Sequence, residues 1–304
     1  MKGRYFSANE YFRQIFGEKV YRISIDAGFS CPNRDGTKGT GGCIYCNAGG
    51  SKASYVNSSL PVEKQLEEGI SLIKKSKGIG KFIAYFQPFS NTYASLERLK
   101  GVYKPALSHP DVVGISIGTR PDCVDDEKLN YLNEIGKEKF VMLEYGVQTL
   151  NDRALNFINR GHNSKTSIEA IIKTKKRENI KVLVHLIFLL PLDDLNQMLD
   201  SIKRLVELGI DGVKFHHLYV EKNTPLEKLY LEGKVVVLKR EEYFEMLTKA
   251  ISILPEKVVI HRLFGECDRE NLVAPEWTNE KTKNINLFNK YIEEKDIFQG
   301  KFFS

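Results

Sequence analysis

Three of the five cysteines fall within sixteen positions, in a glycine-rich segment that follows a predicted strand. Cys43 and Cys46 form a C-x-x-C pair, and Cys31 lies twelve positions ahead of Cys43. Glycine adopts backbone conformations that other residues avoid, so residues 31–46 (the cysteine loop) can fold back and bring three thiolates together. A closed structural site uses four ligands, whereas three leave one coordination position free for a reacting group. The spacing favours an iron–sulfur cluster with one open iron.

Other roles for these cysteines remain open. A structural zinc site would need a fourth ligand, and because the first histidine is His109, Cys123 or Cys267 would have to supply it. Free cysteine is often a buried apolar residue, but these three lie among Gly, Asn, Asp and Lys. A disulfide framework is not expected, because the chain is long, starts without a secretory leader and has an odd number of cysteines.

The composition is that of an ordinary globular protein. The 304 residues are 42% apolar and 28% charged, enough for one large α/β domain with appendages. No apolar run approaches the roughly 20 residues needed to span a bilayer, so we expect a cytoplasmic protein without a membrane partner.

The net charge is +6, and part of the positive charge is grouped. Two groups of basic residues stand out: Lys74, Lys75, Lys77 and Lys81, and Lys173, Lys175, Lys176 and Arg177. Such groups are typical of solvated helix C-termini, where cations complement the helix dipole. A second interpretation is that they contact the phosphates of a nucleic acid.

Strand-like and helix-like segments alternate beyond the first strand at 20–26. Further strands are predicted at 82–86, 112–117, 140–147, 182–189 and 212–217, with a weaker one at 258–261. Alternating apolar strands and helices indicate a parallel sheet covered by helices. Six such units predict an α/β fold with an open or incomplete barrel. A doubly wound sheet is the alternative, but it would want a G-x-G-x-x-G turn after the first strand, where this chain has cysteines. We expect residues 1–19 to be an N-terminal extension, 20–239 the partial barrel, and 240–304 a C-terminal extension packed on it.

Helix boundaries can be placed from terminal signals. Pro61 and Gly78 bracket one helix, and an apolar stripe from Leu195 stops at Gly209. Thr166 and Glu169 predict a capping box. A last amphipathic helix is expected over 278–295.

Polar residues recur where the predicted strands end. In barrels of this kind the chemistry lies at the carboxyl ends of the strands. Arg120 and Asp122 could form a surface pair, and His185 alone could be a core histidine. Glu144 is harder to dismiss, because a carboxylate inside an apolar strand needs a partner. Together these residues favour a site on one rim: Cys31, Gln87, Arg120, Asp122, Glu144, Gln148, His185, His216 and His217.

With these motifs in order, the chain resembles the radical S-adenosylmethionine (SAM) superfamily. It is most similar to the branch of predicted Fe–S oxidoreductases whose barrel is akin to that of the Elongator catalytic subunit and of oxygen-independent coproporphyrinogen oxidase. The resemblance covers roughly residues 5–280. The matching segments are residues 23–36, Gly42-Cys43-Ile44-Tyr45-Cys46, Tyr85-Phe86-Gln87, Thr119-Arg120-Pro121-Asp122, residues 144–149 and Asn159-Arg160-Gly161-His162.

The resemblance implies an incomplete (β/α)6 TIM-like barrel and a 4Fe–4S cluster held by Cys31, Cys43 and Cys46, with the open iron chelating SAM. One electron from the cluster would cleave SAM, and the resulting 5′-deoxyadenosyl radical would take a hydrogen from substrate. Tyr45 would pack a ring beside the cluster. By position, Gln148, Arg160 and His185 match family contacts to SAM, and we expect Gln87, Arg120 and Glu144 to help bind it. Phe86-Gln87 replaces the usual glycine pair, so that contact would be made differently.

The resemblance also implies a function. We expect a tRNA-modifying enzyme that remodels the side chain of a wobble uridine, for example from carboxymethylaminomethyl to aminomethyl, with a flavodoxin or ferredoxin as electron donor. One alternative is a radical SAM enzyme acting on a small metabolite or tetrapyrrole. Another is a non-enzymatic, metal-stabilised RNA-binding module.

Overall fold

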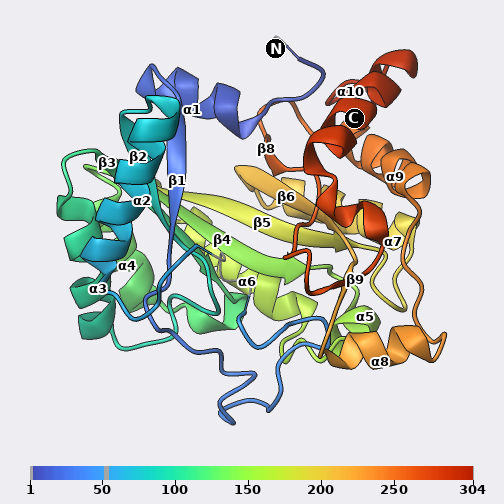
Figure 1. Cartoon of the computed structure of the whole chain (residues 1–304), viewed down its shortest axis with the longest axis horizontal. Coiled ribbons are helices and arrows are strands. Elements are labelled where there is room, and N and C mark those ends of the chain that lie inside the picture. The colour runs from blue at the N-terminus through green and yellow to red at the C-terminus, as the bar shows by residue number, and fades with distance from the viewer. Residues whose placement is uncertain (1–2, 51–54, 304) are drawn as a thin grey trace.

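The computed structural model describes residues 3–50 and 55–303. Within them, seven parallel strands form one curved sheet in the order β1-β2-β3-β4-β5-β6-β8 (Figure 1). The six expected strands are confirmed, and the weaker one joins them as the seventh, beside β6. The two end strands of this order do not pair, so the barrel is incomplete, as predicted. The strands are β1 (Val20–Ile25), β2 (Lys81–Phe86), β3 (Val112–Thr119), β4 (Phe140–Gln148), β5 (Ile180–Phe188), β6 (Gly212–His217) and β8 (Val259–Arg262).

Helices cover the outer face of the sheet, where alternate residues of the strands form the main apolar core. In Figure 1, α2, α3 and α4 lie at one side of the sheet and α9 and α10 at the other. None of the helices among the described residues is both long and apolar enough to cross a membrane. The helices are α1 (Ala8–Phe16), α2 (Val62–Lys77), α3 (Leu96–Ser108), α4 (Asp126–Ile135), α5 (Asp152–Phe157), α6 (Ser164–Lys175), α7 (Leu195–Glu207), α8 (Pro225–Leu231), α9 (Arg240–Ser252) and α10 (Lys281–Glu294).

Two helix starts differ from the sequence-based expectation. The predicted capping box of Thr166 and Glu169 is wrong, because α6 begins three residues earlier. Its cap is Asn163, whose side-chain oxygen accepts from the Thr166 backbone N–H at 3.0 Å. The last helix begins at Lys281 rather than 278, because Glu276–Asn279 form a separate 3-10 turn.

The last strand of the sheet joins segments that are far apart in sequence. β8 comes from the expected C-terminal extension, and its free edge is occupied by Phe6, whose carbonyl accepts from the Ile260 N–H at 2.8 Å. Gln299 is fully buried and holds this arrangement. Its amide donates to the carbonyls of Pro255 (2.8 Å) and Val258 (2.7 Å), and its oxygen accepts from the Phe6 N–H (2.8 Å). The two ends of the chain therefore meet beside β8 (Figure 1).

Candidate functional site

A cavity of about 820 Å³ lies on the inner side of the incomplete barrel. Because parallel strands bring their carboxyl ends to one edge, residues from six different segments reach it. The structure brings eleven of the predicted site residues into its lining: Cys31, Cys43, Tyr45, Cys46, Gln87, Arg120, Glu144, Gln148, Arg160, His185 and His216. Asp122 and His217, which were expected on the same rim, do not line it.

The cysteine loop is held in place by its own backbone and by one arginine. Gly42 has φ +79°, and a Cβ at this position would lie 2.8 Å from Nε of Arg34. Only glycine therefore allows the loop to pack against this side chain without displacing it. Arg34 in turn donates to the carbonyls of Cys46 (3.0 Å) and Ala48 (3.2 Å), which fixes the second half of the loop.

The thiol of Cys43 is surrounded by N–H donors. Nη1 of Arg160 lies 3.5 Å from its sulfur and Nδ2 of Asn33 lies 3.9 Å from it. Burial raises the pKa of the Cys46 thiol, an effect that the nearby Arg34 opposes. Burial also holds the pKa of Tyr45 well above its usual range, with a further contribution from the adjacent Cys43.

These features fit an iron–sulfur cluster. Thiolates hold the irons of such a cluster, and hydrogen bonds to the sulfurs tune it. Here three thiols of one loop face one cavity, and donors are aimed at one of them. Across the described residues, no three Cys, His, Asp or Glu side chains are placed to share a single metal ion. Of the two cysteines considered as a fourth zinc ligand, Cys123 is buried beside Asp122, and Cys267 lines the cavity.

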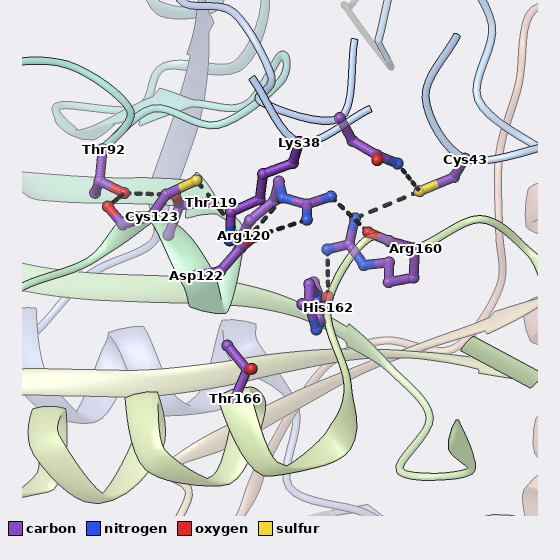
Figure 2. Close-up of polar contacts among 12 residues, drawn as sticks. Lys38, Cys43, Thr92, Thr119, Arg120, Asp122, Cys123, Arg160, His162 and Thr166 are labelled. Atoms are coloured by element: carbon purple, nitrogen blue, oxygen red, sulfur yellow. Dashed lines mark hydrogen bonds and ion pairs between the residues drawn. The ribbon is translucent and has the colours of Figure 1, made fainter. Parts of the chain in front are cut away.

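Arg120 and Asp122 form a buried pair rather than a surface pair (Figure 2). Nε and Nη2 of Arg120 each donate to the Asp122 carboxylate at 2.9 Å, and its Nη1 donates to the Arg160 carbonyl at 2.8 Å. Burial alone would raise the pKa of Asp122, but the hydrogen bonds and charge of Arg120 hold it well below its usual range. Lys38 closes the arrangement by donating to Asp122 at 2.7 Å. Arg120 therefore positions Arg160, which in turn contacts Cys43 (Figure 2).

Glu144 has the partners that its position in an apolar strand required. It is 1% exposed and accepts from Tyr85 (3.0 Å), Ser116 (2.5 Å) and Lys214. His185 lies 2.9 Å from the same carboxylate. Burial alone would raise the pKa of Glu144, but Lys214, Arg22 and His185 hold it well below its usual range. Glu144 is therefore an anion that organises the floor of the cavity.

The cations of this floor were missed by the sequence analysis. Lys214 is 2% exposed on β6, and burial lowers its pKa to about 7 in spite of Glu144. Arg22 on β1 lies 3.6 Å from the Glu144 carboxylate. A signal was available, because Lys214 interrupts an apolar strand as Glu144 does. Burial, followed by the charge of Lys214, lowers the pKa of His185 to about 4, so this ring is neutral at neutral pH.

Gln148 projects from a distorted end of β4. Its φ is +71°, which a residue other than glycine adopts only under strain. Gly146 makes room for it, because a Cβ there would lie 2.9 Å from the Gln148 amide nitrogen and 2.8 Å from Nη2 of Arg160. No hydrogen bond to the Gln148 side chain is present among the described residues, and this side chain faces the cavity. Such strain is typical of residues that position ligands.

The two lysine groups lie at helix C-termini. Lys74 pairs with Asp111 at 2.6 Å and Lys175 with Asp211 at 2.8 Å. Asp111 directly precedes β3 and Asp211 directly precedes β6, so both pairs lie where strands begin, at the sheet edge opposite the cysteine loop. Lys74 and Lys175 therefore lie away from the carboxyl ends of the strands, as the helix-dipole interpretation expects, whereas Lys77 lines the cavity.

Comparison with known proteins agrees with this geometry. A Bacillus subtilis (strain 168) protein with the name Uncharacterized protein YtqA is 37% identical over 300 residues, 99% of this chain and 93% of that one. A tRNA uridine(34) acetyltransferase of Methanocaldococcus jannaschii is 29% identical over 189 residues, 61% of this chain but 34% of that one.

Fold and family comparisons point the same way. The solved structure of the archaeal Methanocaldococcus infernus Elp3 shares the fold, with a TM-score of 0.68 at 19% identity, over 92% of this chain and 64% of that one. The Radical SAM superfamily profile matches residues 35–205, and the Radical_SAM C-terminal domain profile matches residues 210–294. The protein that carries this cysteine loop and cavity belongs to the radical SAM superfamily.

Proposed function

We propose that this protein remodels the side chain of a wobble uridine in tRNA, converting a carboxymethylaminomethyl group to an aminomethyl group. The observation that carries the proposal is the similarity over 189 residues to a protein whose name specifies uridine 34 of tRNA. The cavity supports it, because nine Lys and Arg residues but four Asp and Glu residues line it. An excess of positive charge attracts a polyanion and raises its rate of association.

Two groups of residues would hold the cofactors. Cys31, Cys43 and Cys46 would hold the 4Fe–4S cluster that the family uses, and Arg160 and Gln148 would contact SAM. When bound, the pair supplies hydrogen abstraction and a two-electron oxidation of substrate, with SAM leaving as methionine and 5′-deoxyadenosine.

The chain itself contributes orientation and a fixed set of charges. Arg160 donates to Cys43 and to the Gly146 carbonyl (2.5 Å), so one side chain joins the cysteine loop to the end of β4. Lys214, with a pKa of about 7, can hold or release a proton near neutral pH within the cavity. Glu144 remains ionised beside it and keeps Lys214 in place.

The proposed reaction balances with water as the only further reactant. The methylene between the amine nitrogen and the carboxylate would lose one hydrogen atom and one further electron, and both would end in the cleavage of SAM to methionine and 5′-deoxyadenosine. Water would add to the resulting C=N carbon, the C–N bond would break, and one proton would be released. Glyoxylate leaves, and the aminomethyl group stays on the base.

The test is anaerobic incubation of the reconstituted protein with SAM, a reductant and tRNA that carries carboxymethylaminomethyluridine. Mass spectrometry of the nucleosides should show conversion to aminomethyluridine, with glyoxylate and 5′-deoxyadenosine formed in equal amounts. A deletion strain should accumulate the carboxymethylated nucleoside. Unaltered nucleosides in both experiments would contradict the proposal. Activity on a small metabolite, without a steep dependence on salt, would favour the alternative of a small-metabolite enzyme.

A further inference from the structure

One arginine of the cavity differs from the others. Arg262, at the end of β8, is half-buried and lines the cavity. Within the described part of the chain, its guanidinium takes part in no hydrogen bond and no ion pair. The charge of Arg262 helps to lower the pKa of Glu266, but the Glu266 carboxylate already forms an ion pair with Lys281 at 2.6 Å.

The register of the sheet places Arg262 beside another cation. Lys214 on β6 pairs with Arg262 on β8, and His185 on β5 pairs with Lys214. Like charges opposite each other on neighbouring strands are destabilising unless an anion lies between them. Glu144 satisfies Lys214 and His185 but not Arg262.

A second unpartnered donor lies nearby. Among the described residues, Nε2 of His216 is buried without a hydrogen-bond partner, and the His216 side chain lines the same cavity. Its ring centroid is 5.6 Å from that of His185. Burial, followed by the charge of Arg262, holds the pKa of His216 well below its usual range, so the ring is neutral and can donate one N–H.

We propose that Arg262 and His216 form a carboxylate subsite that binds the end of the substrate's carboxymethyl group. The inference rests on the proposed function, because that substrate has a carboxylate at the tip of the group that is removed. A guanidinium binds a carboxylate through two parallel hydrogen bonds, and a neutral imidazole N–H adds a third. A backbone phosphate of RNA is a poorer match, because nucleotides on both sides of it would have to enter the cavity.

The subsite also accounts for discrimination against the product. The aminomethyl product has lost its carboxylate and carries a cationic amine. Arg262 and Lys214 then repel it instead of binding it, which favours release.

The test compares the wild-type protein with Arg262→Gln, Arg262→Lys and the control Arg204→Gln, all with cluster bound. Arg204 is half-exposed on the outer helix α7, and among the described residues its side chain pairs only with Glu207. The probes are an anticodon stem–loop carrying carboxymethylaminomethyluridine and the same oligonucleotide with a carboxamide in place of the carboxylate. Equilibrium binding of each probe, SAM binding and substrate-free formation of 5′-deoxyadenosine are measured.

We expect the wild type and Arg204→Gln to prefer the carboxylate over the carboxamide by about tenfold or more, which is typical of a charge-assisted contact. Arg262→Gln should lose this preference, and Arg262→Lys should recover part of it. SAM binding and substrate-free 5′-deoxyadenosine formation should change less than about twofold in these variants. Retained discrimination in Arg262→Gln would overturn the subsite. If Arg262→Gln loses SAM binding instead, Arg262 belongs to the cofactor site, and this result would also overturn the subsite.

A further experiment distinguishes failure of this inference from failure of the proposed function. If the wild type neither binds nor converts the oligonucleotide, the proposed function fails. Binding of N-methylglycine to the same proteins then decides the subsite. Binding that Arg262→Gln abolishes would support the subsite for another carboxylate, and binding that is absent or unaffected would overturn it.

Discussion

Two arginines of the same cavity lie in opposite situations. Arg120 is 2% exposed, and Nε, Nη1 and Nη2 each donate a hydrogen bond. Arg262 donates none among the described residues. The comparison teaches that Arg120 acts by holding another residue, whereas Arg262 is available to a ligand.

The adjacent residues His216 and His217 on β6 show the same difference between a side chain with partners and one without. His217 lies 2.9 Å from Thr278 through Nε2, and its Nδ1 accepts from the Gly265 N–H at 3.4 Å. His216 faces the cavity with Nε2 unpartnered. Alternation along the strand sends one ring into a satisfied core and the other toward the ligand space.

The largest effect on activity is expected from replacing cysteines of the cysteine loop. Replacing Cys31, Cys43 or Cys46 by Ala should abolish SAM cleavage, because each would hold a different iron. Cys123→Ala and Cys267→Ala should leave it largely intact. Iron and sulfide content, visible absorbance and 5′-deoxyadenosine formation measure the outcome. A reconstituted Cys31→Ala protein with the wild-type rate would refute the cluster assignment.

The charge cluster on the floor of the cavity can be disrupted through the buried carboxylate of Glu144. Glu144→Gln leaves Lys214 and Arg22 without a counter-charge, and breaking a buried ion pair in this way typically costs about 3–5 kcal/mol. The free energy of unfolding in urea should fall by that amount. Glu134→Gln is the control, because Glu134 pairs with Lys137 on the surface and should matter little. Equal effects in the two variants would mean that Glu144 is not the organising charge.

A smaller effect is expected at the residues assigned to SAM. Arg160→Ala and Gln148→Ala should weaken SAM binding about ten- to a hundredfold, which corresponds to about 1.5–3 kcal/mol for a charge-assisted contact. Both should keep the cluster. Because Arg160 also donates to Cys43, the spectrum of the cluster should shift in Arg160→Ala but not in Gln148→Ala. Unchanged SAM titrations in both variants would show that the SAM pocket lies elsewhere.

The smallest effect tests the satisfied histidine. Burial lowers the pKa of His217 to about 3, so the folded protein keeps it neutral while the unfolded chain takes up a proton below about pH 6.5. The contribution of this group to stability is present above pH 6.5 and is lost as the pH falls toward 3, by at most about 1.4 kcal/mol per pH unit. His217→Gln should flatten the dependence of the urea midpoint between pH 6.5 and 5. An unchanged slope would mean that His217 does not titrate in this way.

The sequence predicts the fold and the cysteine loop better than it predicts the charged residues on the floor of the cavity. The strands and the cysteine loop could be found from local patterns, and so could Gln87, Arg120, Glu144, Gln148 and His185, since each follows a strand or interrupts one. Tyr45 and Arg160 do neither, and only the family resemblance pointed to them. Arg22, Lys214 and Arg262 lie on three strands far apart in the chain, and a single charge on a strand is as typical of a half-exposed position as of a site. Their convergence depends on register and on closure of the sheet around the cavity, which no local pattern contains.

An incomplete barrel retains two free edges, and each is a template for strand pairing with another molecule. At β8, residues 6–7 cover the free edge, and Gln299 holds them against the strand. Gln299→Ala would release that cover while leaving the cavity lining intact. Aggregation of the protein on storage, rather than a loss of catalysis, should therefore be its first visible defect.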